Sequence, residues 1–175
     1  LNRAEIPVAV VTNQAGVARG YYGIEDVHQV HKHMIEEMAR QGAHVDLWLF
    51  CPYHPDGIVE SFARASADRK PGPGMALAAA EALGLDLTAS WVVGDRASDI
   101  GLARAVGAHA LHVGPVAFPE GDVQSFPDLP GAVRLNFFPS GLLGTPSMPL
   151  SDTPLPWIAQ EIATGRMPSL RTESF

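Results

Sequence analysis

The sequence predicts an α/β fold in which a parallel sheet is covered by helices on both faces, giving three layers. Apolar runs of strand length alternate with helix-like segments over the first 135 residues, as in sheets built from strands and crossover helices. The runs 6–11 and 91–93 are almost wholly apolar, which is typical of buried parallel strands. Polar turns follow both runs, and such sheets bind ligands at the carboxyl ends of their strands.

Length and composition indicate a globular protein with a substantial core. The 175 residues are 46% hydrophobic and 18% charged, and the net charge is −7, which argues against a general nucleic-acid binder. No apolar run approaches the roughly 20 residues that span a bilayer, and residues 1–5 do not resemble a secretory signal. The single cysteine cannot form an internal disulfide, so we expect a cytoplasmic setting. We expect no membrane partner, because no run is long enough to span a bilayer.

The first half of the chain predicts two strands and a long helix between them. The strands are 6–11 and 45–50, and the helix is 25–41, with an apolar stripe at helical spacing and three histidines that we assign to a solvated face rather than to a metal. The stripe is Val27, Val30, Met34 and Met38, and the histidines are His28, His31 and His33. Residues 17–23 are expected to form a loop.

The second half predicts further alternation of helix and strand. A loop or short helix over 57–68 precedes a helix that Gly84 ends, and Gly107 ends the helix after the second buried strand. Ser98 or Asp99 is expected to cap that helix. The expected elements are helix 75–83, strand 91–93, helix 98–106, strand 108–113 and helix 128–135.

A change in composition divides the chain near residue 135. We expect a domain over 1–135 and a proline-rich extension over 136–175, in which one short amphipathic helix contains Trp157. That helix could dock on its own domain or on a protein partner, and both alternatives remain open.

Three segments carry residue types that suit a phosphate group and a cation. The turn beginning at Thr12 offers a hydroxyl and backbone N–H groups, and Arg69 and Lys70 precede a Pro-Gly-Pro-Gly turn. Asp95 follows a strand, with Asp99 four residues on, and paired carboxylates can coordinate Mg²⁺. Each segment also has an ordinary alternative: a plain turn, solvated basic residues at a helix start, and a helix cap.

The order of these three segments resembles motifs two, three and four of the haloacid dehalogenase superfamily. The amino-acid sequence of these segments is similar to that of the branch of histidinol-phosphate and heptose-bisphosphate phosphatases. The similarity is nearly residue for residue over 10–20 and again over 51–55 and 69–75. The resemblance covers about residues 1–115 and implies the parallel sheet of that superfamily, with no large cap domain.

The resemblance also implies roles for side chains in the three segments. A hydroxyl and an ammonium would hold the transferring phosphoryl group, amides and guanidinium groups would contact a small phosphorylated substrate, and carboxylates would serve a Mg²⁺ ion. These residues are Thr12 and Lys70 for the phosphoryl group, Asn13, Gln14, Arg69 and Arg96 for the substrate, and Asp95 for Mg²⁺ with Asp99 in support.

Two departures from the family pattern stand out. The first family motif, Asp-x-Asp, supplies the aspartyl nucleophile and does not occur in these 175 residues. Residues 1–5 read as the end of a helix that follows that motif in the family, so we expect the motif upstream of Leu1.

The second departure is a degenerate zinc loop. In the family branch, a Cys-x-His pair and a later Cys-x-Cys pair bind structural zinc. Here Cys51 is retained, but Tyr53 replaces the histidine, and Ser66 and Asp68 replace the two later cysteines. His54, one residue displaced, could complete a mixed site with Cys51 and Asp68, but a loop without zinc is expected because structural zinc takes four good ligands.

Two functions, and a weaker third, therefore remain open. One is a Mg²⁺-dependent phosphatase that hydrolyses a sugar or polyol phosphate through an aspartyl-phosphate. The other is a catalytically silent domain that serves as a binding or assembly module, and a phospho-acceptor receiver domain is a weaker third. The substrate's identity does not follow from the sequence, because loops set it in such folds.

Overall fold

The computed structural model describes residues 1–137. They divide into two compact units, of which the first is Leu1–Arg69 and the second begins at Lys70. Every strand pair in both units is parallel, which confirms the predicted parallel α/β fold. The described strands form two sheets, one in each unit.

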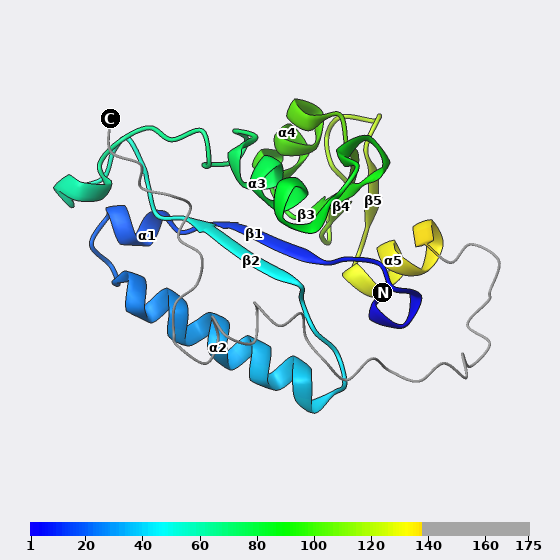
Figure 1. Cartoon of the computed structure of the whole chain (residues 1–175). Coiled ribbons are helices and arrows are strands. Elements are labelled where there is room, and N and C mark those ends of the chain that lie inside the picture. Colours follow the sequence, from blue (N-terminus) through cyan, green and yellow to red (C-terminus); the bar gives the residue numbers. More distant parts are fainter. Residues whose placement is uncertain (138–175) are drawn as a thin grey trace. The chain divides into compact units, whose positions relative to one another are not determined.

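The first unit is a two-stranded sheet with a long helix alongside it (Figure 1). Strand β1 (Ala9–Asn13) pairs with β2 (Leu47–Cys51). Helix α2 (Ile24–Arg40) connects them, because parallel neighbours require a crossover. The short elements of this unit are η1 (Asn2–Ala4), α1 (Ala15–Ala18) and η2 (Glu60–Phe62).

The first strand lies further along the chain than predicted. It ends at Asn13, so Thr12 and Asn13 belong to the strand, and helix α1 occupies the start of the expected loop. The pairing explains the shift, because Thr12 lies opposite Phe50 and the Gln14 N–H still donates to the Cys51 carbonyl at 2.8 Å. The polar side chains after the apolar run are therefore held at the strand end.

The buried face of α2 also differs from the predicted stripe. Val30 and Met34 are 57% and 43% exposed, whereas His31 is only 3% exposed. The His31 ring centroid lies 4.9 Å from that of Trp48 and 5.9 Å from that of Phe50. The prediction that the histidines lie on a solvated face is therefore wrong for His31, since aromatic contacts with β2 accommodate its ring.

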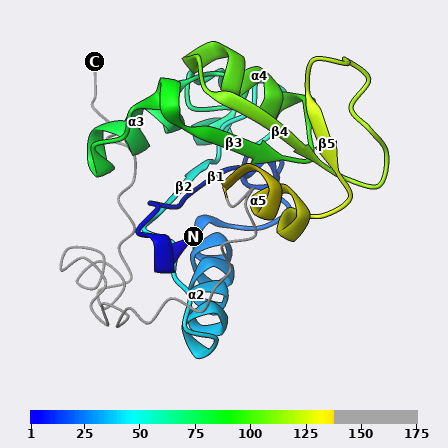
Figure 2. The same cartoon turned by 90° about the vertical axis from the view of Figure 1, so that its right-hand side faces the viewer.

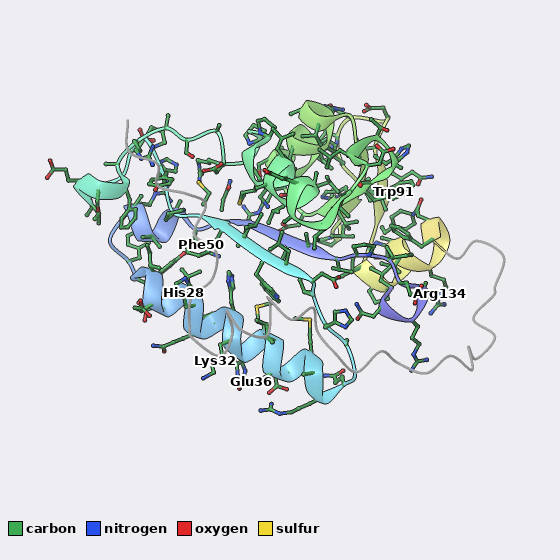
Figure 3. All side chains as sticks on the ribbon, viewed as in Figure 1. His28, Lys32, Glu36, Phe50, Trp91 and Arg134 are labelled. Atoms are coloured by element: carbon green, nitrogen blue, oxygen red, sulfur yellow. The ribbon has the colours of Figure 1, made fainter. Side chains whose placement is uncertain are left out.

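His28 reaches the same strand from one turn earlier on α2. Its ring centroid is 5.6 Å from that of Phe50, and Figure 3 shows the two side chains between helix and strand. Burial lowers the pKa of His31, and the neighbouring His28 lowers it further. Lys32 and Glu36 on the same helix are exposed.

The second unit is a three-stranded sheet in the order β3, β4, β5. Figure 2 shows α4 above these strands and α5 below them, and each helix packs against two of the strands. The predicted layering therefore holds within this unit, and β5 is a strand that the sequence did not indicate. The bounds are α3 (Gly74–Leu83), η3 (Leu87–Ala89), β3 (Trp91–Gly94), α4 (Ala97–Val106), β4 (His109–Val113), β5 (Gln124–Phe126) and α5 (Leu129–Phe137).

The ends of the helices in this unit follow the glycines. Gly84 and Gly107 end α3 and α4 with φ of 65° and 72°, a left-handed conformation that costs glycine little. The start of α4 differs from expectation, because Arg96 rather than Ser98 or Asp99 precedes the first helical residue. Asp99 instead reaches back from the first turn, where its Oδ2 accepts the Arg96 N–H at 3.0 Å.

Within residues 1–137, none of the helices has the length and hydropathy needed to cross a bilayer. The proposed boundary at residue 135 stays a prediction. The Trp157 helix and the proline-rich extension lie beyond the described residues, apart from the last two positions of α5.

Candidate active site

The site residues expected from the sequence are divided between the two units. The structure brings several of them together within each unit. The first unit contains Thr12, Asn13, Gln14, Cys51, His54 and Arg69, and the second contains Lys70, Asp95, Arg96 and Asp99.

Thr12 is held in a chain of side-chain hydrogen bonds at the end of β1. Gln14 Nε2 donates to Thr12 Oγ1 at 3.2 Å, and Gln14 Oε1 accepts the Tyr22 hydroxyl at 2.8 Å. A hydroxyl that accepts a bond still carries a proton of its own. The Thr12 oxygen is therefore oriented by Gln14 while its O–H can donate to an anion.

Tyr22 is a part of this arrangement that the sequence did not single out. Its ring lies against Gly16, where any side chain would overlap the ring. The glycine therefore permits the ring to reach over α1 towards Gln14. The sequence offered one indication of this contact, because Tyr22 carries a hydroxyl and lies two residues after Gly20. Gly20 ends the preceding segment with φ of 69°.

Lys70 and Asp99 form a buried ion pair in the second unit. The distance from Lys70 Nζ to Asp99 Oδ1 is 2.7 Å, and the two side chains are 13% and 7% exposed. The other carboxylate oxygen, Oδ2, accepts the Arg96 N–H. Asp99 thus ties the lysine to the start of α4.

Gly94 lets this carboxylate approach the end of β3. A Cβ at position 94 would overlap the carboxylate of Asp99. A residue other than glycine would have to displace Asp99, and with it Lys70. Glycine at position 94, the last residue of β3, is therefore required by packing.

Asp95 offers an accessible carboxylate beside this pair. Its side chain is 68% exposed, and Arg96, itself 78% exposed, approaches it with Nε at 3.3 Å from Oδ2. Mg²⁺ keeps several waters and needs only one or two carboxylates together with phosphate oxygens. An exposed carboxylate at a strand end fits that ion. Both Asp99 oxygens are already engaged, which fits a supporting position.

No group of three or more His, Cys, Asp and Glu side chains that could hold a metal occurs in residues 1–137. The role of Asp95 as a Mg²⁺ ligand stays a prediction. The mixed zinc site of Cys51, His54 and Asp68 is likewise not formed there.

Arg69 presents a buried cationic donor. Its Nη1 is buried and has no hydrogen-bond partner among the described residues. An unpaired buried N–H is costly, so a bound anion would stabilise it. This agrees with the substrate contact expected for Arg69.

The degenerate zinc loop is closed by polar and aromatic contacts. Ser66 Oγ donates to Asp68 Oδ2 at 3.2 Å and accepts the Asp68 N–H at 3.1 Å. The Arg64 guanidinium lies 3.9 Å from the Tyr53 ring centroid, a cation–π contact. Cys51 is fully buried, and burial raises the pKa of its thiol.

Comparisons with known proteins identify the family of this chain. The family described as HAD-hyrolase-like matches residues 67–134. A D-glycero-beta-D-manno-heptose-1,7-bisphosphate 7-phosphatase of Rhodopseudomonas palustris is 45% identical over 107 residues, which are 61% of this chain and 59% of that protein. The chain thus spans about three fifths of that relative. The enzyme of the same name from Yersinia pestis is 36% identical over 139 residues, 74% of each chain.

A solved structure shares the fold. The D,D-heptose 1.7-bisphosphate phosphatase of B. bronchiseptica, crystallised with magnesium and phosphate, superposes with a TM-score of 0.62 at 30% identity. The match covers 73% of this chain and 72% of that one. From the parallel α/β fold, the ordered motifs and these relatives, the chain belongs to the haloacid dehalogenase-like phosphatase family, in the branch of the heptose-bisphosphate phosphatases.

Proposed function

We propose that this chain carries most of the active site of a Mg²⁺-dependent phosphatase that acts on a sugar bisphosphate of the heptose 1,7-bisphosphate class. The observation that carries the proposal is the buried pair of Lys70 and Asp99 beside the Gly94 turn. A lysine held at a strand end next to an accessible carboxylate, Asp95, suits phosphate binding. The relatives named above support the choice of substrate class.

Each side chain has a defined part in phosphoryl transfer. Negative charge spreads over the phosphoryl oxygens in the transition state, so catalysis depends on positioned donors and cations. The Lys70 ammonium neutralises that charge, and the Thr12 hydroxyl donates to a phosphoryl oxygen. Arg69 contacts the substrate, with Asn13, Gln14 and Arg96 also assigned to its surroundings. Asp95 holds Mg²⁺, which supplies further positive charge when bound.

The nucleophile is proposed to come from outside the sequence described above, because no Asp-x-Asp occurs in the 175 residues. Its carboxylate oxygen would attack phosphorus while the bond to the sugar oxygen breaks and that oxygen takes up a proton. Water then hydrolyses the aspartyl-phosphate. The residues of this chain hold the phosphoryl group in both steps.

Phosphate release by the natural protein, with whatever sequence precedes Leu1, tests the proposal. The substrate is D-glycero-D-manno-heptose 1,7-bisphosphate, with Mg²⁺ or with a chelator. We expect release that requires Mg²⁺ and that Asp95→Asn lowers by about 100-fold or more. A protein that releases no phosphate under either condition would instead be a catalytically silent module.

A further inference from the structure

A second group of hydrogen-bond donors lies in the first unit, at the far end of α1. Arg19 is the residue that follows α1, and His54 follows β2 by three positions. Arg19 Nη2 and His54 Nε2 are 3.4 Å apart. The phosphate site proposed above uses neither side chain.

The proton on the His54 ring can be assigned from its other nitrogen. His54 Nδ1 accepts the backbone N–H of Asp56 at 3.1 Å, so Nδ1 carries no proton. The neutral imidazole then carries its proton on Nε2. The Asp56 carboxylate is 3.8 Å from Nδ1 and 86% exposed, too far for a hydrogen bond.

Arg19 and His54 are therefore two donors that face each other. A guanidinium N–H and an imidazole N–H cannot bond to one another, but both can donate to one acceptor placed between them. A phosphate oxygen is such an acceptor, and arginine favours it. The His54 side chain is 11% exposed, so its ring is largely fixed while Arg19 remains exposed to solvent.

Backbone hydrogen bonds hold the loop that carries His54 next to Arg19. The carbonyl of Ala18, next to Arg19, accepts the N–H of Ile58 at 2.8 Å and that of Val59 at 3.0 Å. A Cβ at Gly57 would lie 2.9 Å from the same carbonyl oxygen, so only glycine allows this approach. The loop that carries His54 is thus held on the end of α1, and a ligand would bind to donors already in place.

The pair serves a different group from the one at Thr12. Thr12 precedes α1 and is held by Gln14, whereas Arg19 follows the last residue of this four-residue helix. A substrate with two phosphates carries a second anion for the pair.

We propose that Arg19 and His54 bind the second, non-transferring phosphate of a sugar bisphosphate. The assignment rests on the proposed function, because it takes the transferring phosphate to be the one that the Thr12 hydroxyl contacts. It makes the pair a specificity-determining feature that favours bisphosphates over monophosphates.

Steady-state kinetics of the natural protein test this role. The substrates are D-glycero-D-manno-heptose 1,7-bisphosphate and the matching 7-phosphate. Arg19→Ala should raise KM for the bisphosphate by roughly 10- to 100-fold, the value of a lost charge-assisted bond. KM for the 7-phosphate should stay within about twofold. Arg19→Lys should recover part of the lost affinity, since a lysine keeps the positive charge but not the bidentate geometry of the guanidinium.

Arg40→Ala is the matched control, because Arg40 is an exposed arginine at the far end of α2 in the same unit. It should leave both KM values unchanged. An Arg19→Ala protein whose KM values change equally for both substrates, or for neither, would overturn the proposal.

Nuclear magnetic resonance of the His54 ring gives a readout independent of turnover. Titration with the bisphosphate should shift the Nε2–H resonance, and Arg19→Ala should abolish the shift. If no phosphate is released but this shift is seen, the proposed function fails, and the anion-binding role of Arg19 and His54 stands. If phosphate is released and the resonance does not respond, the pair fails and the function stands.

Discussion

The ammonium of Lys70 lies 2.7 Å from Oδ1 of Asp99, and the two side chains are only 13% and 7% exposed. The second oxygen of this carboxylate accepts the Arg96 N–H. One acidic side chain therefore sets the position of the lysine and the first turn of α4. Removing it should affect both stability and phosphate binding.

Asp99→Ala should lower the free energy of unfolding by about 3 kcal/mol, because it leaves a buried ammonium without its partner. Urea denaturation measures the loss. Asp122→Ala is the control, since Asp122 also pairs with a basic side chain, that of Arg104, but both side chains are largely exposed. That change should cost less than about 1 kcal/mol. Equal losses for the two variants would show that the Lys70 pair stabilises the fold no more than an exposed pair does.

Tyr22→Phe should weaken catalysis without unfolding the protein. The change removes the hydroxyl that holds Gln14, which in turn orients Thr12. Loss of one hydrogen bond predicts a fall of about five- to tenfold in kcat/KM. Tyr21→Phe is the control, because Tyr21 is 75% exposed. Identical kinetics for the Tyr22→Phe and Tyr21→Phe proteins would show that the Tyr22 hydroxyl does not contribute to catalysis.

His31 should make stability depend on pH. Burial lowers the pKa of His31 below its ordinary 6.5, and His28 adds to this. As the pH falls through 6.5, the unfolded chain takes up a proton at His31 before the folded protein does, so stability falls towards acid pH. Tm measured from about pH 8 to about pH 5.5 should fall less in His31→Phe than in the wild type.

The control for this titration is His33→Gln, since His33 is an exposed histidine on the same helix. It should keep the wild-type dependence of Tm on pH. A His31→Phe protein with the full wild-type dependence would assign the effect to another group.

The sequence indicated the positions of helices better than their buried faces. Periodicity and the terminal glycine placed α2 within one residue of each end. Its buried side was misjudged because histidine counts as polar, whereas the ring of His31 packs against Trp48 and Phe50. Such contacts depend on the neighbouring strand, which helical spacing alone does not reveal.

The candidate site was predictable only as a set of segments. Motif order pointed to Lys70 and Asp99, and the structure adds that they bond directly. Their separation of 29 positions gives no local signal for such a contact. The same holds for Arg19 and His54, which come together because the backbone of the loop bonds to the end of α1.

Cys51 should be unreactive in the folded protein. It is fully buried, and burial raises the pKa of its thiol, so little thiolate is present near neutral pH. A disulfide reagent should label it slowly until denaturant is added, after which one thiol per chain reacts. A chelator should not speed the labelling, since no zinc is expected on this loop. Faster labelling with chelator would indicate a metal on Cys51.

The most direct test of the proposed active site compares the two lysines of this chain, Lys70 and Lys32. Lys32 is exposed on α2 and provides the matched control. In the natural protein with heptose 1,7-bisphosphate and Mg²⁺, Lys70→Met should lower kcat by about 100-fold or more, while Lys32→Met should match the wild type. A Lys70→Met protein that releases phosphate at the wild-type rate would contradict the account.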